Sequence, residues 1–310
     1  MLPSDVAPTL CDSPLTQHRS GVFSLHVPKK PTVPILIAAP HGGRDYPDAV
    51  TANFRSAMSR MRLEDRHVDT LALEIANQTG AAVLCAEAPR AMIDLNRAPD
   101  DVDWSMVIGG SPENTRHSYA NRRARSGLGL VPRKLPGLGE IWKRPLQRAE
   151  LDRRIDRIHR PYHEALGATL EQLRDNWGSA LLMDLHSMPP LKPSQADWSA
   201  PEVVIGDRFG SSCDGRISAS ALNYFGEHGR PVAHNRPYAG GYVLDRHGAP
   251  RRGIHAIQVE ICRTTYLDSG LDRPSARLPG VARLIAGLVR TLASEVNDLI
   301  LDNSFRQAAE

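Results

Sequence analysis

The chain reads Ile35-Leu36-Ile37-Ala38-Ala39-Pro40-His41-Gly42-Gly43 near its beginning, so an apolar run typical of a buried strand ends in a histidine. The stretch Leu181-Leu182-Met183-Asp184-Leu185-His186-Ser187 repeats this pattern. In open α/β sheets, ligands bind at the carboxyl ends of the strands. We therefore expect His41 and His186 at one edge of the sheet, where an α/β hydrolase presents metal ligands.

Helical and strand-like segments alternate along the rest of the chain. Residues 63–78 place apolar side chains on one face and are followed by Gly80, which predicts a helix and its end. The apolar run 81–86 predicts a strand, so the chain begins with a β-α-β unit. Further elements are expected at 145–176 (helix), 203–205 (strand), 216–226 (helix), 254–261 (strand) and 279–301 (amphipathic helix). This alternation predicts an α/β sandwich.

Composition limits the class of protein. The chain has 310 residues, of which 41% are hydrophobic and 24% charged, as in ordinary globular proteins. The formal net charge of +3 is too small to indicate a nucleic-acid partner. No apolar stretch is long enough to cross a membrane, and no secretory signal is recognisable. We expect a cytoplasmic protein without a membrane partner, whose four dispersed cysteines, Cys11, Cys85, Cys213 and Cys262, are buried free thiols.

The sequence shows no domain boundary. We expect a loosely ordered tail at 1–20, a single domain at 21–302 and a short C-terminal tail at 303–310. Residues 98–145 are rich in Gly, Pro, Arg and Ser, and so long an irregular stretch inside a compact domain is usually functional or mobile. This composition predicts a lid-like insertion.

Two histidines need a third partner to make a catalytic zinc site, because such a site has three protein ligands and an open position for water. We predict one zinc ion with Asp65 as its third ligand, because Asp65 opens the predicted helix after the first strand and its side chain could reach back to the strand ends. An acid at this position could instead complement the helix dipole. Asp45 and Glu64 are alternative ligands, and Asp69 could support the site from outside.

A further carboxylate is placed for proton transfer. In Ile257-Gln258-Val259-Glu260-Ile261, Glu260 falls on the same side as Gln258 and opposite the apolar residues. At the edge of the sheet it could take a proton from the zinc-bound water and deliver it to a leaving amine. The alternative is a surface acid on an edge strand.

Two short motifs suggest substrate binding. Asn96 and Arg97 lie side by side after Asp94, and the planar fork of an arginine suits bidentate binding of a carboxylate. An Asp94–Arg97 salt bridge is the structural alternative. The loop Tyr238-Ala239-Gly240-Gly241-Tyr242 could bring a phenol into a pocket, although such loops are often only turns.

These motifs occur in a recognisable order. Pro40-His41-Gly42-Gly43, Asp65-Arg66-His67-Val68-Asp69, Asp94-Leu95-Asn96-Arg97, Asp184-Leu185-His186-Ser187, the Tyr238–Tyr242 loop and Gly253-Ile254-His255-Ala256-Ile257-Gln258-Val259-Glu260 follow one another. The set resembles the N-formylglutamate amidohydrolase family over roughly residues 33 to 270. That family is similar in fold to the zinc carboxypeptidases and aspartoacylases.

The resemblance implies a three-layer sandwich with a mixed central sheet, the phosphorylase/hydrolase-like fold of zinc-dependent exopeptidases. It also implies zinc on His41 and His186, a general base at Glu260, and carboxylate binding at Asn96 and Arg97. The carboxypeptidase pattern places its acidic ligand three residues after the first histidine, where this chain has Arg44. Asp65 therefore stays our prediction for the third ligand.

The resulting expectation is a zinc-dependent amidohydrolase that cleaves an N-acyl amino acid, above all N-formyl-L-glutamate into formate and glutamate. Zinc and a nearby arginine, Arg97, would polarise the amide carbonyl, and the partner is a small substrate that bears a carboxylate. The enzymatic alternative is a carboxypeptidase-like peptidase or a deacylase of another N-acyl amino acid. A non-catalytic metal-binding or ligand-binding module is the alternative of another class, but such a module has no need of a general base.

Overall fold

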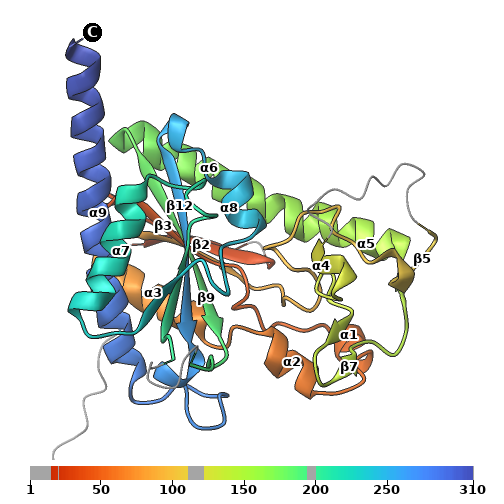
Figure 1. Ribbon diagram of the computed structural model, residues 1–310. Helices are drawn as coiled ribbons and strands as arrows, with labels where there is room; N and C mark the ends of the chain where they lie inside the picture. Colours follow the sequence, from red (N-terminus) through yellow and green to blue (C-terminus); the bar gives the residue numbers. More distant parts are fainter. Residues whose placement is uncertain (1–14, 20, 111–121, 194–199, 310) are drawn as a thin grey trace, which may run out of the picture.

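A mixed sheet of eight strands forms the centre of the molecule (Figure 1). The computed structural model describes residues 15–19, 21–110, 122–193 and 200–309. The strands lie in the order β1-β2-β4-β3-β9-β12-β10-β11. Their bounds are β1 Leu15–Arg19, β2 Phe23–Pro28, β3 Ile35–Ala39, β4 Ala82–Ala86, β9 Ala180–Met188, β10 Val203–Gly206, β11 Val232–His234 and β12 Ile254–Cys262.

The four central strands β4, β3, β9 and β12 are parallel to their neighbours. β2 and β10 run antiparallel to the outer members of this group, which makes the sheet mixed. Helix α3 (Val68–Thr79) connects β3 to the parallel strand β4, so the predicted β-α-β unit is confirmed. The predicted α/β class and mixed sheet are confirmed with it.

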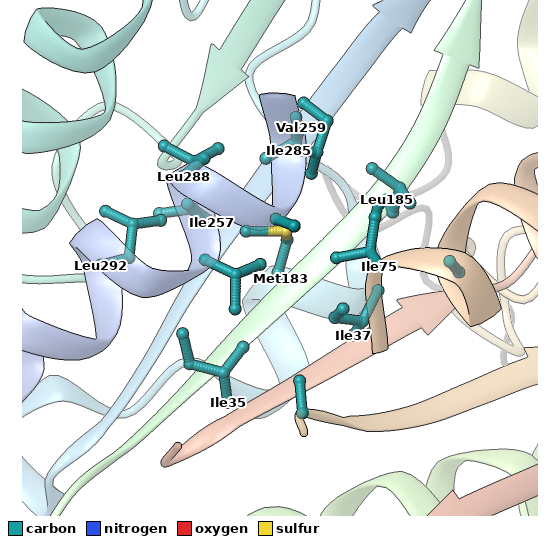
Figure 2. Close-up of a cluster of buried hydrophobic side chains, with 14 of the residues drawn as sticks. Ile35, Ile37, Ile75, Met183, Leu185, Ile257, Val259, Ile285, Leu288 and Leu292 are labelled. Atoms are coloured by element: carbon teal, nitrogen blue, oxygen red, sulfur yellow. The ribbon is translucent and has the colours of Figure 1, made fainter. Parts of the chain in front are cut away.

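One face of the sheet packs against α3, α7 (Gly215–Glu227) and α9 (Leu278–Ala309). The strands contribute every second side chain to this face, because successive residues of a strand point to opposite sides. Figure 2 shows the result for the central strands, α3 and α9, whose apolar side chains interdigitate. The labelled residues are Ile35, Ile37, Ile75, Met183, Leu185, Ile257, Val259, Ile285, Leu288 and Leu292.

The intervening side chains of the same strands pack on the other face, against α5 (Arg148–Arg154), α6 (Arg160–Trp177) and α8 (Tyr242–His247). α5 and α6 join through one turn of π-helix at Ile155–His159. The C-terminal part of α9 extends beyond the sheet, at the upper left of Figure 1.

Some predicted boundaries were wrong. The segment 63–78 divides into α2 (Met58–Leu63) and α3, and Asp65 lies in the connection instead of opening a helix. The left-handed conformation of His67 turns the chain immediately before α3. Residues 15–19 of the expected tail pair as β1 with β2, and α9 continues to Ala309 instead of ending near 301.

The expected insertion contains several short elements in its described residues. These are a 3₁₀ turn at Trp104–Met106, β5 Val107–Ile108, α4 Arg122–Arg125, β6 Lys134–Leu135 and β7 Gly139–Glu140. β5 pairs with β8 Leu146–Gln147, which lies just beyond the insertion. Outside the insertion, the short helix α1 (Asp48–Ala52) precedes α2 in the chain. Apolar residues such as Leu130, Ile141 and Trp142 anchor the segment in the core. Residues 111–121 lie outside the described part, so a lid role stays a prediction.

Three of the predicted free cysteines, Cys85, Cys213 and Cys262, are unpaired and buried, whereas Cys11 lies outside the described residues. Among the described helices, none combines the length and apolar character needed to cross a membrane.

Candidate metal centre and active site

The site begins where two central strands change from apolar to polar side chains. On one face, β9 continues from Leu182 to Asp184 and His186, and its neighbour β12 continues from Gln258 to Glu260. Asp184 pairs with Gln258, and His186 with Glu260, in the parallel register. His186 was expected at the end of its strand, and it lies two residues before the last residue of β9, which pairing with β12 extends to Met188. The four polar side chains are nevertheless collected at the carboxyl end of the sheet.

His41 follows β3 at the same edge and is only 2% exposed. The chain must turn tightly here, because a side chain at Gly43 would meet the carbonyl groups of Glu87 and Ala88 at 2.5 and 2.4 Å. The amide of Asp65 donates a hydrogen bond of 3.0 Å to the carbonyl of His41. This backbone contact brings Asp65 to the strand end, although not by the helical route that the sequence suggested.

The predicted metal ligands His41, Asp65 and His186 form one buried group whose ligand atoms all lie within 4.8 Å of one another. Nδ1 of His186 lies 3.1 Å from Oδ2 of Asp65, and Nδ1 of His41 lies 3.4 Å from the same oxygen. Nδ1 of His41 has no hydrogen-bond partner. Both imidazoles therefore direct their Nδ1 atoms to a common point beside the carboxylate of Asp65.

The opposite ring nitrogens are held by two further carboxylates. Nε2 of His41 lies 2.7 Å from Oδ1 of Asp94, and Nε2 of His186 lies 2.9 Å from Oδ2 of Asp184. With a proton on each Nε2 donated to these carboxylates, the two Nδ1 lone pairs can bind a cation beside the negative oxygen of Asp65. Carboxylate–histidine pairs of this kind orient the imidazole ligands of metal ions. The donor set thus fits a zinc ion.

The electrostatic environment also favours positive charge. Burial alone would lower the pKa of His186, but the nearby carboxylates of Asp184 and Asp65 raise it well above its ordinary value. Burial would raise the pKa of Asp65, but the nearby imidazoles of His186 and His41 lower it well below the usual range. Arg263 adds to this effect on geometry, since its Nη2 donates to Oδ1 of Asp65 at 3.0 Å.

The alternative acids lie elsewhere. Asp69 accepts two hydrogen bonds of 2.8 Å from Arg44, and Glu64 accepts one of 2.6 Å from Arg66. Asp45 is exposed. Of the acids considered as ligands, only Asp65 faces both imidazoles in the described structure.

Glu260 is buried in a central strand, so the alternative of a surface acid on an edge strand was wrong. Its Oε1 accepts a hydrogen bond of 2.9 Å from the amide of Gln258. Burial raises the pKa of Glu260 to about 7, with the charge of His186 opposing the shift and that of Asp65 adding to it. A carboxylate with such a pKa can both accept and return a proton near neutral pH.

Asn96 and Arg97 lie at the same edge, where Asn96 approaches His186. The amide of Asn96 lies 3.3 Å from Nε2 of His186, and its oxygen accepts a hydrogen bond of 2.9 Å from the amide of Val243. Arg97 donates through Nε to the carbonyl of Leu128 and through Nη1 to that of Asn96. The alternative Asp94–Arg97 salt bridge is present only at 4.0 Å, through Nε. Nη2 of Arg97 has no partner among the described residues and can donate to a ligand.

A cavity of about 210 Å³ opens onto these groups. It is lined by His41, Asp65, His186 and Glu260, and also by Asn96, Arg97, Tyr238, Gly240 and Gly241. A side chain at Gly241 would lie 2.5 Å from the amide oxygen of Asn96, so a glycine is required there. Tyr242 is not part of this lining, since it begins α8 and its hydroxyl accepts a hydrogen bond from Arg246.

The family model of the N-formylglutamate amidohydrolases matches residues 33–267 of this chain. The chain belongs to this family. An N-formylglutamate deformylase of Pseudomonas putida is 32% identical over 240 residues, which cover 76% of this chain and 82% of the relative. A protein of the same name from Pseudomonas aeruginosa is 28% identical over 270 residues, covering 85% and 92%.

A solved structure from the N-formylglutamate amidohydrolases supports the fold. The crystal structure of the amidohydrolase from Ralstonia eutropha superposes with a TM-score of 0.79 at 30% identity, covering 90% of this chain and 99% of the other. A crystal structure from Agrobacterium tumefaciens has a TM-score of 0.64 at 16% identity and covers 89% and 96%, which shows a shared fold alone.

The motifs shared with the N-formylglutamate amidohydrolases did not point to two cavity arginines. Arg90 donates through Nε to Asp94 at 2.9 Å and keeps both Nη groups without a partner among the described residues. Arg263 binds Asp65 and Ser187. Arg90 could have been found from its position four residues before Asp94, with which it forms an ion pair. Asp94 also holds His41, so this spacing brings Arg90 close to the site.

Sequence reasoning also missed a group of histidines behind the Asn96–Arg97 segment. Nε2 of His159 donates to the carbonyl of Arg97 at 2.9 Å, and Nε2 of His163 donates to that of Leu95 at 3.0 Å. Nδ1 of His163 then accepts from Nε2 of His247 at 3.0 Å. The π-helical turn that ends at His159 brings both donors to one face of the α5–α6 helix. These neutral rings fix the backbone on either side of Asn96.

Proposed function

We propose that the protein is a zinc-dependent amidohydrolase that converts N-formyl-L-glutamate into formate and glutamate. The names of the relatives support this substrate. The observation that supports the proposal most strongly is the buried group in which two imidazoles face Asp65 beside Glu260. Each imidazole is hydrogen-bonded on its other ring nitrogen to a further carboxylate. The proposal includes the three-layer sandwich of zinc-dependent exopeptidases, with helices on both faces of the sheet.

His41, Asp65 and His186 would hold the zinc ion, which supplies a Lewis acid and lowers the pKa of a water molecule. Glu260 would accept a proton from the attacking water and return it to the nitrogen of the leaving amino acid. Its position beside His186 and its pKa of about 7 suit both steps.

The arginines divide the binding of substrate between them. Nη2 of Arg97 and the neighbouring Asn96 bind the carboxylate next to the scissile amide, as expected from the sequence. Arg90 lines the cavity with two Nη groups that have no partner in the described part of the chain, and the carboxylates of Asp65 and Glu260 act on its charge. It therefore takes over the role of polarising the amide carbonyl, for which the sequence had suggested Arg97.

The test compares substrates on the zinc-loaded protein. N-formyl-L-glutamate, N-acetyl-L-glutamate and a dipeptide with C-terminal glutamate are incubated separately, and the products are identified by mass spectrometry. We expect formate and glutamate, and the same protein treated with a chelator serves as the control. Faster cleavage of the dipeptide would indicate a peptidase, faster cleavage of the acetyl compound another deacylase, and stoichiometric metal without cleavage a binding module.

A further inference from the structure

The cavity contains more positive charge than the reaction centre uses. Five arginines line it, Arg62, Arg90, Arg97, Arg123 and Arg263, against the lining acids Asp65 and Glu260. Arg263 is engaged with Asp65, and Arg90 and Arg97 both lie near Asp94, which holds His41. Among the described residues no carboxylate pairs with Arg123, which extends from the short helix α4.

Arg123 is held at a fixed place relative to Arg97. The amide of Leu128 donates a hydrogen bond of 2.8 Å to the carbonyl of Arg123, and the carbonyl of the same Leu128 accepts one of 3.0 Å from Nε of Arg97. The helix is also tied to the core, because the amide of Ala124 donates to the buried Asp101 at 3.0 Å. The backbone of Leu128 therefore connects Arg123 to Arg97.

The two guanidinium groups affect each other across the cavity. Burial lowers the pKa of Arg97, Asp94 opposes this shift, and the positive charges of Arg90 and Arg123 add to it. Two like charges that face one cavity are stabilised by an anion between or beside them. The substrate of the proposed function has a second carboxylate at the end of its side chain, beyond the one next to the amide.

We propose that Arg123 forms a second carboxylate subsite, which selects N-acyl derivatives of acidic amino acids by binding the side-chain carboxylate while Arg97 binds the other. The cavity-lining side chains Leu128 and Leu135 offer apolar contact to the methylene groups between the two carboxylates. The inference rests on the proposed function and adds the origin of its specificity.

The test measures kcat and KM of the zinc-loaded enzyme for N-formyl-L-glutamate and for N-formyl-L-glutamine, which has the same shape without the side-chain charge. Arg123→Gln should lower kcat/KM for the glutamate compound by roughly 10- to 100-fold, mainly through KM, because a charge-assisted hydrogen bond is lost. The effect on the glutamine compound should be much smaller. Arg125→Gln is the matched control, since Arg125 is exposed on the same helix and does not line the cavity.

A charge reversal sharpens the result. Arg123→Glu should shift the preference toward N-formyl-L-lysine, whose side chain ends in a positive charge. An unchanged preference for glutamate over glutamine in Arg123→Gln overturns the inference, as does a loss of preference in Arg62→Gln instead. Equal cleavage of both compounds by the unmodified enzyme also overturns it but leaves the proposed function standing. Cleavage of neither compound removes both.

Discussion

Glu260 and His186 are register partners in the parallel pair β12–β9, so their side chains leave the sheet on the same face. Neighbouring parallel strands keep partners side by side along their whole length, which fixes the proposed proton-transferring carboxylate next to a proposed metal ligand without a loop. Since both strands are central and buried, this relationship is as rigid as the core.

The first prediction concerns Glu260. Glu260→Gln should lower kcat by at least about 10²-fold, the lower part of the range for general acid–base catalysis, and should leave zinc bound, because Glu260 is not a proposed ligand. Steady-state kinetics measure the loss of kcat, and elemental analysis measures the bound zinc. Glu227→Gln, at the exposed end of α7, is the control. Near-full turnover with metal in place would show that Glu260 is not the general base.

The second prediction concerns metal content. His41→Ala and His186→Ala should each abolish stoichiometric zinc, because each removes one of the three proposed ligands. Asp94→Asn should weaken zinc binding by roughly 10- to 100-fold, since Asp94 orients the imidazole of His41. Elemental analysis and competition with a chelator measure both effects, and His228→Ala, at an exposed position, is the control. Unchanged metal in both histidine variants would place the site elsewhere.

The sequence was informative where a pattern belongs to a single strand. The two apolar runs that end near His41 and His186, and the alternation around Glu260, predicted the sheet edge and three residues that meet there. Asp65 was chosen for a wrong reason. No helix begins at this residue, and a hydrogen bond to the backbone of His41 sets its position, which depends on how distant segments pack.

Contacts between segments far apart in the sequence could not be predicted. Arg263 lies 198 positions from its partner Asp65, and His163 lies 68 positions from the carbonyl of Leu95 that it holds. No local period marks such pairs. Tyr242 shows the converse, because its place in a motif suggested a pocket residue, whereas the first turn of α8 directs it toward His163.

The third prediction concerns Arg97. Arg97→Lys should raise KM for N-formyl-L-glutamate and change kcat little, because binding shared by the ground and transition states is lost. A lysine cannot donate to Leu128, Asn96 and a substrate carboxylate in the fixed geometry of a guanidinium. Steady-state kinetics measure the effect, with Arg125→Lys as the control. Unaltered kinetics on every substrate that bears a carboxylate would contradict the role.

The last prediction concerns the buried histidines behind the active site. Burial, together with the charges of His159 and His247, lowers the pKa of His163 to about 2, and burial lowers that of His247 to about 3. In the unfolded chain both rings bind a proton near pH 6.5. Between that pH and the folded values, the unfolded state holds more protons, so the free energy of unfolding falls as the pH falls, by up to about 1.4 kcal/mol per pH unit for each histidine.

This acid sensitivity should become weaker when one ring is removed. His163→Gln keeps an amide that can donate to the carbonyl of Leu95 but does not titrate, so its free energy of unfolding should fall less steeply between pH 6.5 and 4.5 than that of the unmodified protein. Urea unfolding of the zinc-loaded proteins at several pH values measures the slopes, and comparing the two slopes removes the contribution of zinc release, which both share. His228→Gln, at an exposed position, should leave the slope unchanged. Parallel slopes for His163→Gln and the unmodified protein would mean that His163 already binds a proton in the folded state. The neutral ring that donates to the carbonyl of Leu95 and accepts from His247 would then be wrong.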